Sequence, residues 1–160
     1  MDPRRALPSV DRVVAHLSGL PHALLVDAAR DALDSARAAI AHGAAVSTDL
    51  ASRRVIADFG PEHLRRLLDK LEPQLVFANE EEREELGPAA AAKATWVLKR
   101  GADGCAIEHG GERSEFPAVP AEVVDTTGAG DAFAAGYLVG GVELALATAA
   151  RCVANLGATP

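Results

Sequence analysis

The sequence is poor in aromatic residues and in cysteine, and it lacks a long apolar run. One Trp, one Tyr and four Phe occur among 160 residues, so Ala, Val and Leu must supply most of the core. Cys105 and Cys152 lie in apolar surroundings and form no CxxC pair, which indicates reduced core residues rather than a disulfide or a zinc site. No apolar run looks long enough to span a bilayer, and no apolar h-region follows Arg4 and Arg5, so we expect neither a membrane span nor a signal peptide.

Basic residues are also too few to give a cationic surface. The chain has 16 Lys and Arg against 23 Asp and Glu, a formal net charge of −7, and the basic residues form no stripe. This balance argues against a nucleic acid or an anionic membrane as partner and favours small anions bound by local contacts. We expect a cytoplasmic protein with a single domain over residues 1–160, in which the first 19 residues are irregular.

The order of apolar runs and helical periods predicts an α/β fold. Strands are expected at 23–28, 44–50, 74–79 and 94–100, and helices at 32–42, 61–71 and 80–86 between them. Continuous apolar strands are typical of a parallel sheet covered by helices. A hairpin of 105–109 and 114–119 should follow, then a short strand at 122–125 and two apolar helices at 130–138 and 142–156.

The run DTTGAGD, Asp125 to Asp131, carries the strongest chemical signal. Two carboxylates flank a small-residue turn that opens an apolar helix, so unpaired N–H groups can approach a phosphate beside a carboxylate. This is a layout for phosphoryl transfer, in which Asp131 can reach a hydroxyl placed over the same N–H groups. The plain alternative is a glycine-rich turn in which Asp131 only stabilises the start of a helix.

A second candidate is Asn79 with Glu82. Asn79 ends a predicted strand and Glu82 lies one helical turn later, so both side chains can face one site. An amide and a carboxylate suit a hydrated magnesium ion and a phosphate. The alternative is a solvated acidic run at a helix start.

Two further positions have open interpretations. Lys99, in the run KRGADG, either meets nucleotide phosphates as a point charge or belongs to an ordinary strand-to-turn connection. Asp49 ends a predicted strand and is either an outer acid of the site or a turn residue. Polar residues lie at or just after the ends of the predicted strands: Asp49, Asn79 with Glu82, Arg100-Gly101 and Asp125-Thr127. They should therefore meet at the carboxyl edge of the sheet, where open α/β sheets bind ligands.

These motifs together resemble the ribokinase-like (PfkB) carbohydrate kinases. DTTGAGDAF followed by AAGYLVG is similar to the C-terminal signature of that family, NEEE at 79–82 to its NxxE motif, and KRGADGC at 99–105 to its glycine turn. The resemblance runs from about residue 20 to the C-terminus and corresponds to the later half of a typical member. It implies a three-layer αβα ribokinase-like fold, truncated at the N-terminus.

The resemblance also implies roles for named residues. Asp131 would be the catalytic base, acting over an anion hole formed by Gly128, Ala129 and Gly130. The implied nucleotide-binding residues are Asn79, Lys99 and Gly101. Glu82 would hold magnesium through water, and the implied monovalent-cation residues are Asp125 and Thr127.

The function implied is ATP-dependent phosphoryl transfer to a sugar hydroxyl, with ATP and Mg²⁺ and, as in some members, K⁺. An alternative is a non-catalytic nucleotide-binding fragment, because the half that forms most of the sugar pocket is missing from the sequence. A flavodoxin-like or response-regulator-type domain would fit the sheet but leaves DTTGAGD unexplained. A halved fold should expose apolar surface, so we expect self-association or a partner chain.

Overall fold

A computed structural model describes residues 22–50, 53–87 and 90–157. Within these ranges a mixed sheet runs in the order β1-β2-β3-β4-β5. Its strands are β1 (Ser47–Asp49), β2 (Leu75–Asn79), β3 (Thr95–Lys99), β4 (Cys105–His109) and β5 (Glu112–Phe116). The first three strands are parallel, and β4 and β5 form an antiparallel hairpin against β3, so the α/β fold with a C-terminal hairpin is confirmed.

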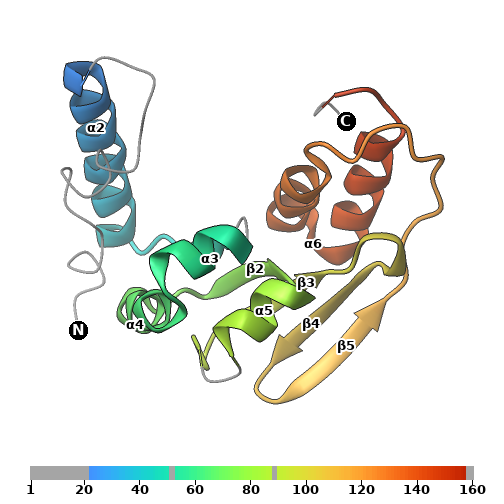
Figure 1. Cartoon of the computed structure of the whole chain (residues 1–160), viewed down its shortest axis with the longest axis horizontal. Helices are drawn as coiled ribbons and strands as arrows, with labels where there is room; N and C mark the ends of the chain where they lie inside the picture. Colours follow the sequence, from blue (N-terminus) through green and yellow to red (C-terminus); the bar gives the residue numbers. More distant parts are fainter. Residues whose placement is uncertain (1–21, 51–52, 88–89, 158–160) are drawn as a thin grey trace.

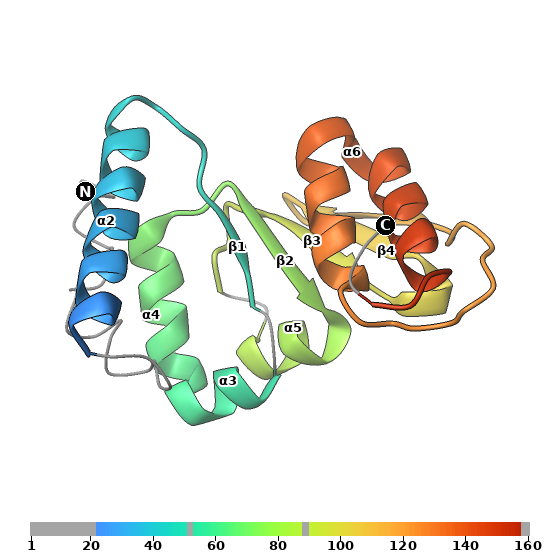
Figure 2. The same ribbon diagram turned by 90° about the horizontal axis from the view of Figure 1, so that it is seen from above.

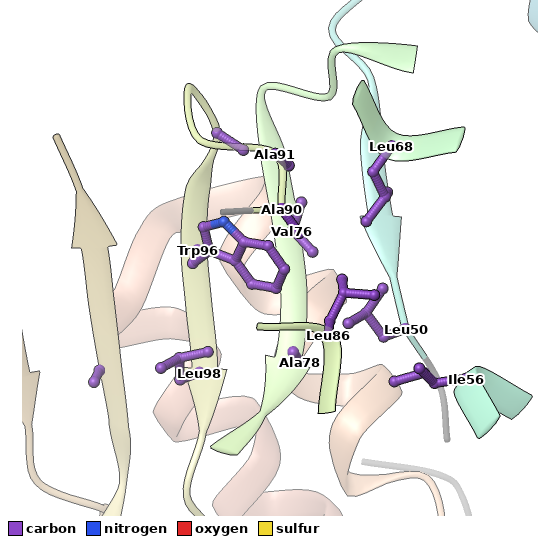
Figure 3. Packing of buried hydrophobic residues seen from close by; sticks show 12 residues of the cluster. Leu50, Ile56, Leu68, Val76, Ala78, Leu86, Ala90, Ala91, Trp96 and Leu98 are labelled. Carbon is purple, nitrogen blue, oxygen red and sulfur yellow. The ribbon is translucent and has the colours of Figure 1, made fainter. Parts of the chain in front are cut away.

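Helices cover both faces of the sheet, which gives three layers (Figures 1 and 2). One face carries α3 (Arg53–Phe59), α4 (Pro61–Leu71) and α5 (Glu80–Leu86), and the other carries α6 (Ala129–Val153). Alternate strand residues point to opposite layers. Val76 and Trp96 pack in the first core, which Figure 3 shows from close by, whereas Phe77 and Val97 pack against α6.

The predicted strand at 23–28 is wrong, because these residues belong to α2 (His22–Ala41). A six-residue apolar run does not by itself distinguish a strand from a helix. No Gly or Pro separates this run from the Ala-rich stretch that follows, so one helix continues through both. The helix expected at 32–42 is therefore confirmed as its second half. The expectation of an irregular segment at 1–19 lies outside the described residues.

The predicted strand at 122–125 is also wrong, since these residues form no strand. The N–H groups of Val124 and Asp125 instead donate to the carbonyl of Val153, at 2.7 and 3.2 Å. This segment therefore lies against the end of α6 rather than in the sheet. The sequence also gave no signal for α3, a seven-residue helix that was not expected.

The two apolar helices expected near the C-terminus form the two legs of α6, which is broken at Gly140 and Gly141. The backbone leaves helical geometry there, with φ of −148° and 75°. The legs lie side by side in both views (Figures 1 and 2). A Cβ on Gly136 would lie 2.8 Å from the carbonyl oxygen of Leu144, so the absence of a side chain permits the close packing of the two legs.

By length and composition, α6 is the one helix in the described part of the chain that could cross a membrane, which corrects the expectation that no apolar run is long enough. The break at Gly140 and Gly141 divides its 25 residues into two short legs. Spanning a bilayer takes about 20 continuous helical residues, so neither leg spans one by itself. One leg buries Phe133 and the other Ala145 against the sheet.

Candidate functional site

Three polar side chains lie at the carboxyl edge of the parallel strands, and the sequence predicts this for two of them, Asp49 and Asn79. Asp49 ends β1, Asn79 ends β2 and Lys99 ends β3. Asp49 lies opposite Phe77, and Asn79 lies opposite Lys99 in the register of the strands. The sheet topology thus brings together residues up to 50 positions apart in the sequence.

Lys99 lies between a carboxylate and the start of α6. Its Nζ is 2.7 Å from Oδ2 of Asp49, and both side chains are largely shielded from solvent. The same Nζ is 3.5 Å from the point that a Cβ on Gly130 would occupy. Two motifs that the sequence treats separately, KRGADG and DTTGAGD, therefore share one site. The ion pair with Asp49 could not be foreseen, because it depends on the order of the strands.

The turn before α6 leaves backbone donors free at the helix start. Gly128 caps the helix in the left-handed region at φ 76° and contributes no side-chain hydrogen bond. The N–H of Ala129 donates to the carbonyl of Thr126, and that of Ala132 donates to Gly128. The N–H groups of Gly130 and Asp131 have no acceptor among the described residues, as expected in a first helical turn. These donors are suited to an anion.

Asp131 is exposed in the first turn of α6. No hydrogen bond or ion pair from the described part of the chain engages its carboxylate. Its carboxylate lies at the positive end of the helix dipole. Asp131 is thus an exposed carboxylate, without a hydrogen-bond partner among the described residues, beside free N–H donors.

Asp125, the other carboxylate of the DTTGAGD motif, binds two backbone N–H groups. Oδ1 of Asp125 accepts a hydrogen bond from the N–H of Thr127 at 2.9 Å, and Oδ2 accepts one from the N–H of Gly157 at 3.0 Å. Hydrogen bonding to Thr127, and then to Gly157, lowers the pKa of Asp125 below its ordinary value. Asp125 therefore ties the turn to the chain segment after α6.

Cys152 adds a second tie to the same turn. Its Sγ–H donates to the carbonyl oxygen of Thr127, with 3.5 Å between the two heavy atoms. Both cysteines are free and buried, which confirms the prediction of reduced core residues. The prediction that Asp125 and Thr127 hold a monovalent cation stays a prediction, because the contacts described for these residues are with the protein itself.

Asn79 and Glu82 form a capping box at the start of α5. Oδ1 of Asn79 accepts a hydrogen bond from the N–H of Glu82 at 2.8 Å, and Oε2 of Glu82 accepts one from the N–H of Asn79 at 2.9 Å. This reciprocal pair satisfies two donors at the helix start. Glu82 is only 4% exposed. The NxxE motif thus has a structural role, and its predicted contacts with magnesium and phosphate stay predictions.

The glycine turn after β3 packs closely against the backbone that follows β5. Gly101 begins the short helix η2 (Gly101–Asp103), and Gly104 follows it at φ 88°. A Cβ on Gly104 would overlap the carbonyl oxygen of Phe116 and would lie 2.6 Å from the N of Ala118. The backbone after β5 therefore passes directly over this turn, and only glycine permits the approach.

An ion-pair ring holds the same region from the outside. Glu80 and Glu115 each bind both Arg100 and Arg113, at distances from 2.9 to 3.4 Å. The hydrogen bond that Arg113 donates to Glu80 is the main cause of the raised pKa of Arg113, and the one that it donates to Glu115 is the main cause of the lowered pKa of Glu115. The ring joins α5 to the turn after β3 and to the hairpin.

A pocket of about 540 Å³ opens between the turn after β3, the segment after β5 and α6. One wall is apolar and includes Val119, Pro120, Ala150 and Val153. The polar end is formed by Lys99 and the start of α6, and Thr126, Ala129 and Gly130 also line it. The sequence missed this pocket, because its walls come from segments without a chemical motif.

Two titratable groups, one buried and one half-buried, lie in the core against α6. Burial raises the pKa of the Cys105 thiol, and burial also raises the pKa of Tyr137. Tyr137 makes an edge contact with Phe77, with the ring centroids 5.5 Å apart. Both groups are therefore neutral near pH 7 and act as packing residues.

The described residues contain no group of three or more His, Cys, Asp or Glu side chains that would hold a metal ion by themselves. Single carboxylates are present near the free N–H donors, above all that of Asp131. This donor set does not suit zinc or calcium, but it fits magnesium, which keeps several waters and shares substrate phosphates.

The family model described as pfkB family carbohydrate kinase matches residues 11–159. A cytidine kinase of Thermococcus kodakarensis is 36% identical over 115 residues, which cover 57% of this chain and 40% of that protein. A 2-dehydro-3-deoxygluconokinase of Dickeya dadantii is 59% identical over 46 residues, 26% of this chain and 15% of that protein. The chain spans less than half the length of these curated relatives.

Solved structures with the same fold are kinases as well. Adenosine kinase from Sinorhizobium meliloti superposes with a TM-score of 0.69 at 27% identity, covering 82% of this chain and 46% of that one. Aminoimidazole riboside kinase from Salmonella enterica, solved with aminoimidazole riboside and an ATP analog, gives 0.63 at 28% identity, covering 81% of this chain and 53% of that one. The ribokinase-like fold class is thereby confirmed.

Proposed function

The chain belongs to the pfkB family of carbohydrate kinases, and on that premise we propose that it transfers a phosphoryl group from ATP to a hydroxyl of a sugar or nucleoside acceptor. The observation that carries the proposal is the start of α6. Gly130, whose N–H is free, lines the pocket beside Lys99, and the exposed carboxylate of Asp131 lies in the same helical turn.

The nucleotide would lie in the 540 Å³ pocket. Its apolar wall, with Val119, Pro120 and Val153, suits the faces of a base, which bury apolar surface without needing a charge. The phosphates would then extend toward Lys99 and Gly130 at the polar end. Gly101 lines the same pocket and would lie beside the nucleotide.

The chemistry would rest on positioning and charge. The N–H groups of Gly130 and Asp131, with the turn from Gly128 to Ala129 behind them, would stabilise the negative charge of the transferring phosphoryl group. The carboxylate of Asp131 would orient the acceptor hydroxyl and take its proton. A weak base is sufficient, because the transition state of phosphoryl transfer is largely dissociative in most analyses.

Magnesium would act between the phosphates and the protein. Glu82, in its capping box beside Asn79, is the carboxylate that would hold the ion through water. When bound, the ion would neutralise phosphate charge. The residues of this chain would fix where the phosphates lie.

The acceptor class follows from the relatives. A cytidine kinase, an adenosine kinase and an aminoimidazole riboside kinase act on nucleosides or ribosides by their names, and 2-dehydro-3-deoxygluconokinase acts on a sugar acid. Because the chain spans about half of the solved relatives or less, activity of the 160-residue chain with any of these acceptors is part of the proposal.

The proposal is tested by ATP-dependent phosphorylation of a panel of nucleosides, sugars and sugar acids with magnesium. The wild-type chain should phosphorylate a member of the panel. Asp131→Asn should lower kcat by at least about a hundredfold, the lower range for loss of a general base, while its affinity for ATP stays within about twofold. Arg151→Gln, an exposed change late in α6, is a control that should leave both quantities unchanged.

Three results would decide the matter. Turnover that survives Asp131→Asn would remove this residue from the role of base. ATP binding without turnover of any acceptor would favour a nucleotide-binding unit that lacks its acceptor half. Failure to bind ATP or ADP would contradict the proposed function as a whole.

A further inference from the structure

Asp49 and Lys99 form an ion pair between two strands that are not neighbours in the sheet. The two residues end β1 and β3, and β2 lies between these strands. Lys99 therefore reaches across a neighbouring strand to place its Nζ 2.7 Å from Oδ2 of Asp49. The side chains are 20% and 27% exposed, so water is largely excluded from the contact. A lysine at a strand end could instead extend into solvent.

This contact fixes where the ammonium lies. A lysine stem has four rotatable bonds, and without a partner its charge samples many positions. Here the Nζ and the Cδ of Lys99 lie 3.5 and 3.9 Å from the point that a Cβ on Gly130 would occupy. The ammonium is held directly beside the free N–H groups of the α6 start. Gly130 leaves room for it, because a side chain there would contact the lysine.

The charge arrangement is unusual for an anion site. A carboxylate close to bound phosphates repels them, so Asp49 weakens anion binding through its charge alone. An ammonium carries three donors, and Asp49 uses one of them, which leaves others for phosphate oxygens. The orientation gained by Lys99 is the effect that can offset the repulsion.

We propose that Asp49 is a positioning residue, which holds Lys99 over Gly130 so that the ammonium meets the phosphates of the nucleotide. This inference rests on the proposed function, because it takes the α6 start as the phosphate site. It adds a residue from β1 to a site otherwise built from β3 and α6. Asp49 would touch neither the nucleotide nor the acceptor, and would act through Lys99.

The test compares binding of ADP and adenosine by calorimetry. Adenosine fills the base pocket but has no phosphate, so it reports on the pocket alone. Asp49→Asn keeps the size of the side chain and removes its charge. It should weaken the binding of ADP about tenfold and leave the binding of adenosine unchanged. Tenfold is the lower end of what the loss of an outer hydrogen-bond partner costs in affinity at metal sites. Lys99→Met should weaken ADP at least as much.

The double variant separates positioning from a direct effect. If Asp49 acts only through Lys99, the variant with both changes should bind ADP no more weakly than Lys99→Met alone. Asp49→Glu, which keeps the carboxylate, should recover part of the affinity. Glu72→Gln is the matched control, since Glu72 pairs with Lys93 at 3.7 Å on an exposed surface. It should leave the affinities for ADP and for adenosine unchanged.

Each other result overturns the inference. Unchanged or tighter ADP binding in Asp49→Asn would mean that the carboxylate only repels phosphate. Equal losses for ADP and adenosine would mean that the pair only stabilises the sheet. If the wild-type chain binds neither ligand, the proposed function fails and the inference fails with it, whereas ADP binding that is insensitive to Asp49 overturns the inference alone.

Discussion

The carboxylate of Asp125 accepts a hydrogen bond from the backbone N–H of Gly157, at 3.0 Å, across 32 residues of sequence. The other carboxylate oxygen binds the N–H of Thr127. The first carboxylate of the DTTGAGD run thus ties the turn before α6 to the segment after α6, whereas the second, Asp131, has no such bond among the described residues. This division of roles shapes the predictions that follow.

Asp125→Asn should destabilise the chain at pH 7 and flatten its acid unfolding. The pKa of Asp125 is lowered in the folded state, so its contribution is present above the unfolded pKa and is lost as the pH falls through the folded value. Urea unfolding from pH 7 to pH 2 measures this. The free-energy difference between wild type and variant should shrink below about pH 4. A difference that is constant with pH would contradict the role of the charge.

Gly104→Ala should be among the most destabilising single changes in the chain. A Cβ there overlaps backbone atoms of the 116–118 segment, and φ of 88° is itself unfavourable for alanine. We expect a loss of at least about 3 kcal/mol in the free energy of unfolding. Gly111→Ala is the matched control, because φ is 89° there and a Cβ would meet nothing within 4 Å. Equal losses in both variants would mean that the close approach does not matter.

Gly130→Ala should separate folding from phosphate binding. Gly130 is helical, and an added Cβ would make an ordinary contact 3.5 Å from Nζ of Lys99. Stability should be unchanged or higher, because alanine is favoured in helices by up to about 1 kcal/mol over glycine. Binding of ADP should weaken, since the methyl group enters the space proposed for phosphate, while adenosine binding stays the same. Unchanged ADP affinity, measured by calorimetry, would place the phosphates elsewhere.

Self-association, expected from the sequence, stays a prediction, and the exposed apolar residues of α6 are the surface through which we expect it. Leu138 and Val139 at the end of the first leg of α6 are 59% and 82% exposed, and Leu144 in the second leg is 42% exposed. Replacing Leu138 and Val139 by Ser should shift the chain toward monomer in light scattering across a concentration series. Replacing exposed Glu143 by Gln is the control. A wild-type chain that is monomeric at all concentrations would contradict the prediction.

Elements with clear end signals could be predicted closely. The helix over 80–86 has the predicted bounds, because a Gly-Pro pair follows its acidic run, and Asn79 caps its start in the structure. Pro61 likewise marks the first residue of α4. The apolar runs at 23–28 and 122–125 gave the wrong element. Run length does not decide between helix and strand. The N–H groups of Val124 and Asp125 bind a carbonyl at the end of α6 and not a strand of the sheet.

The site could be predicted in its parts but not in its assembly. Residue types and strand ends located Lys99, Asn79 and Asp131. The contact of Lys99 with Asp49 and Gly130 depends on the strand order and on where α6 lies, which no local pattern specifies. The NxxE motif was interpreted as a metal and phosphate motif, and its capping box is a purely local interaction that the spacing also allowed.

The central claim is that a nucleotide binds in the 540 Å³ pocket between the segment after β5 and α6, with its phosphates at Lys99 and Gly130. Backbone amide shifts of the ¹⁵N-labelled chain, followed by NMR during titration with ADP, test this most directly. The account predicts that the largest changes fall at Lys99, Gly130 and Val153. Changes confined to other surfaces, such as the groove lined by Glu72 and Lys93 at the opposite edge of the sheet, would contradict it.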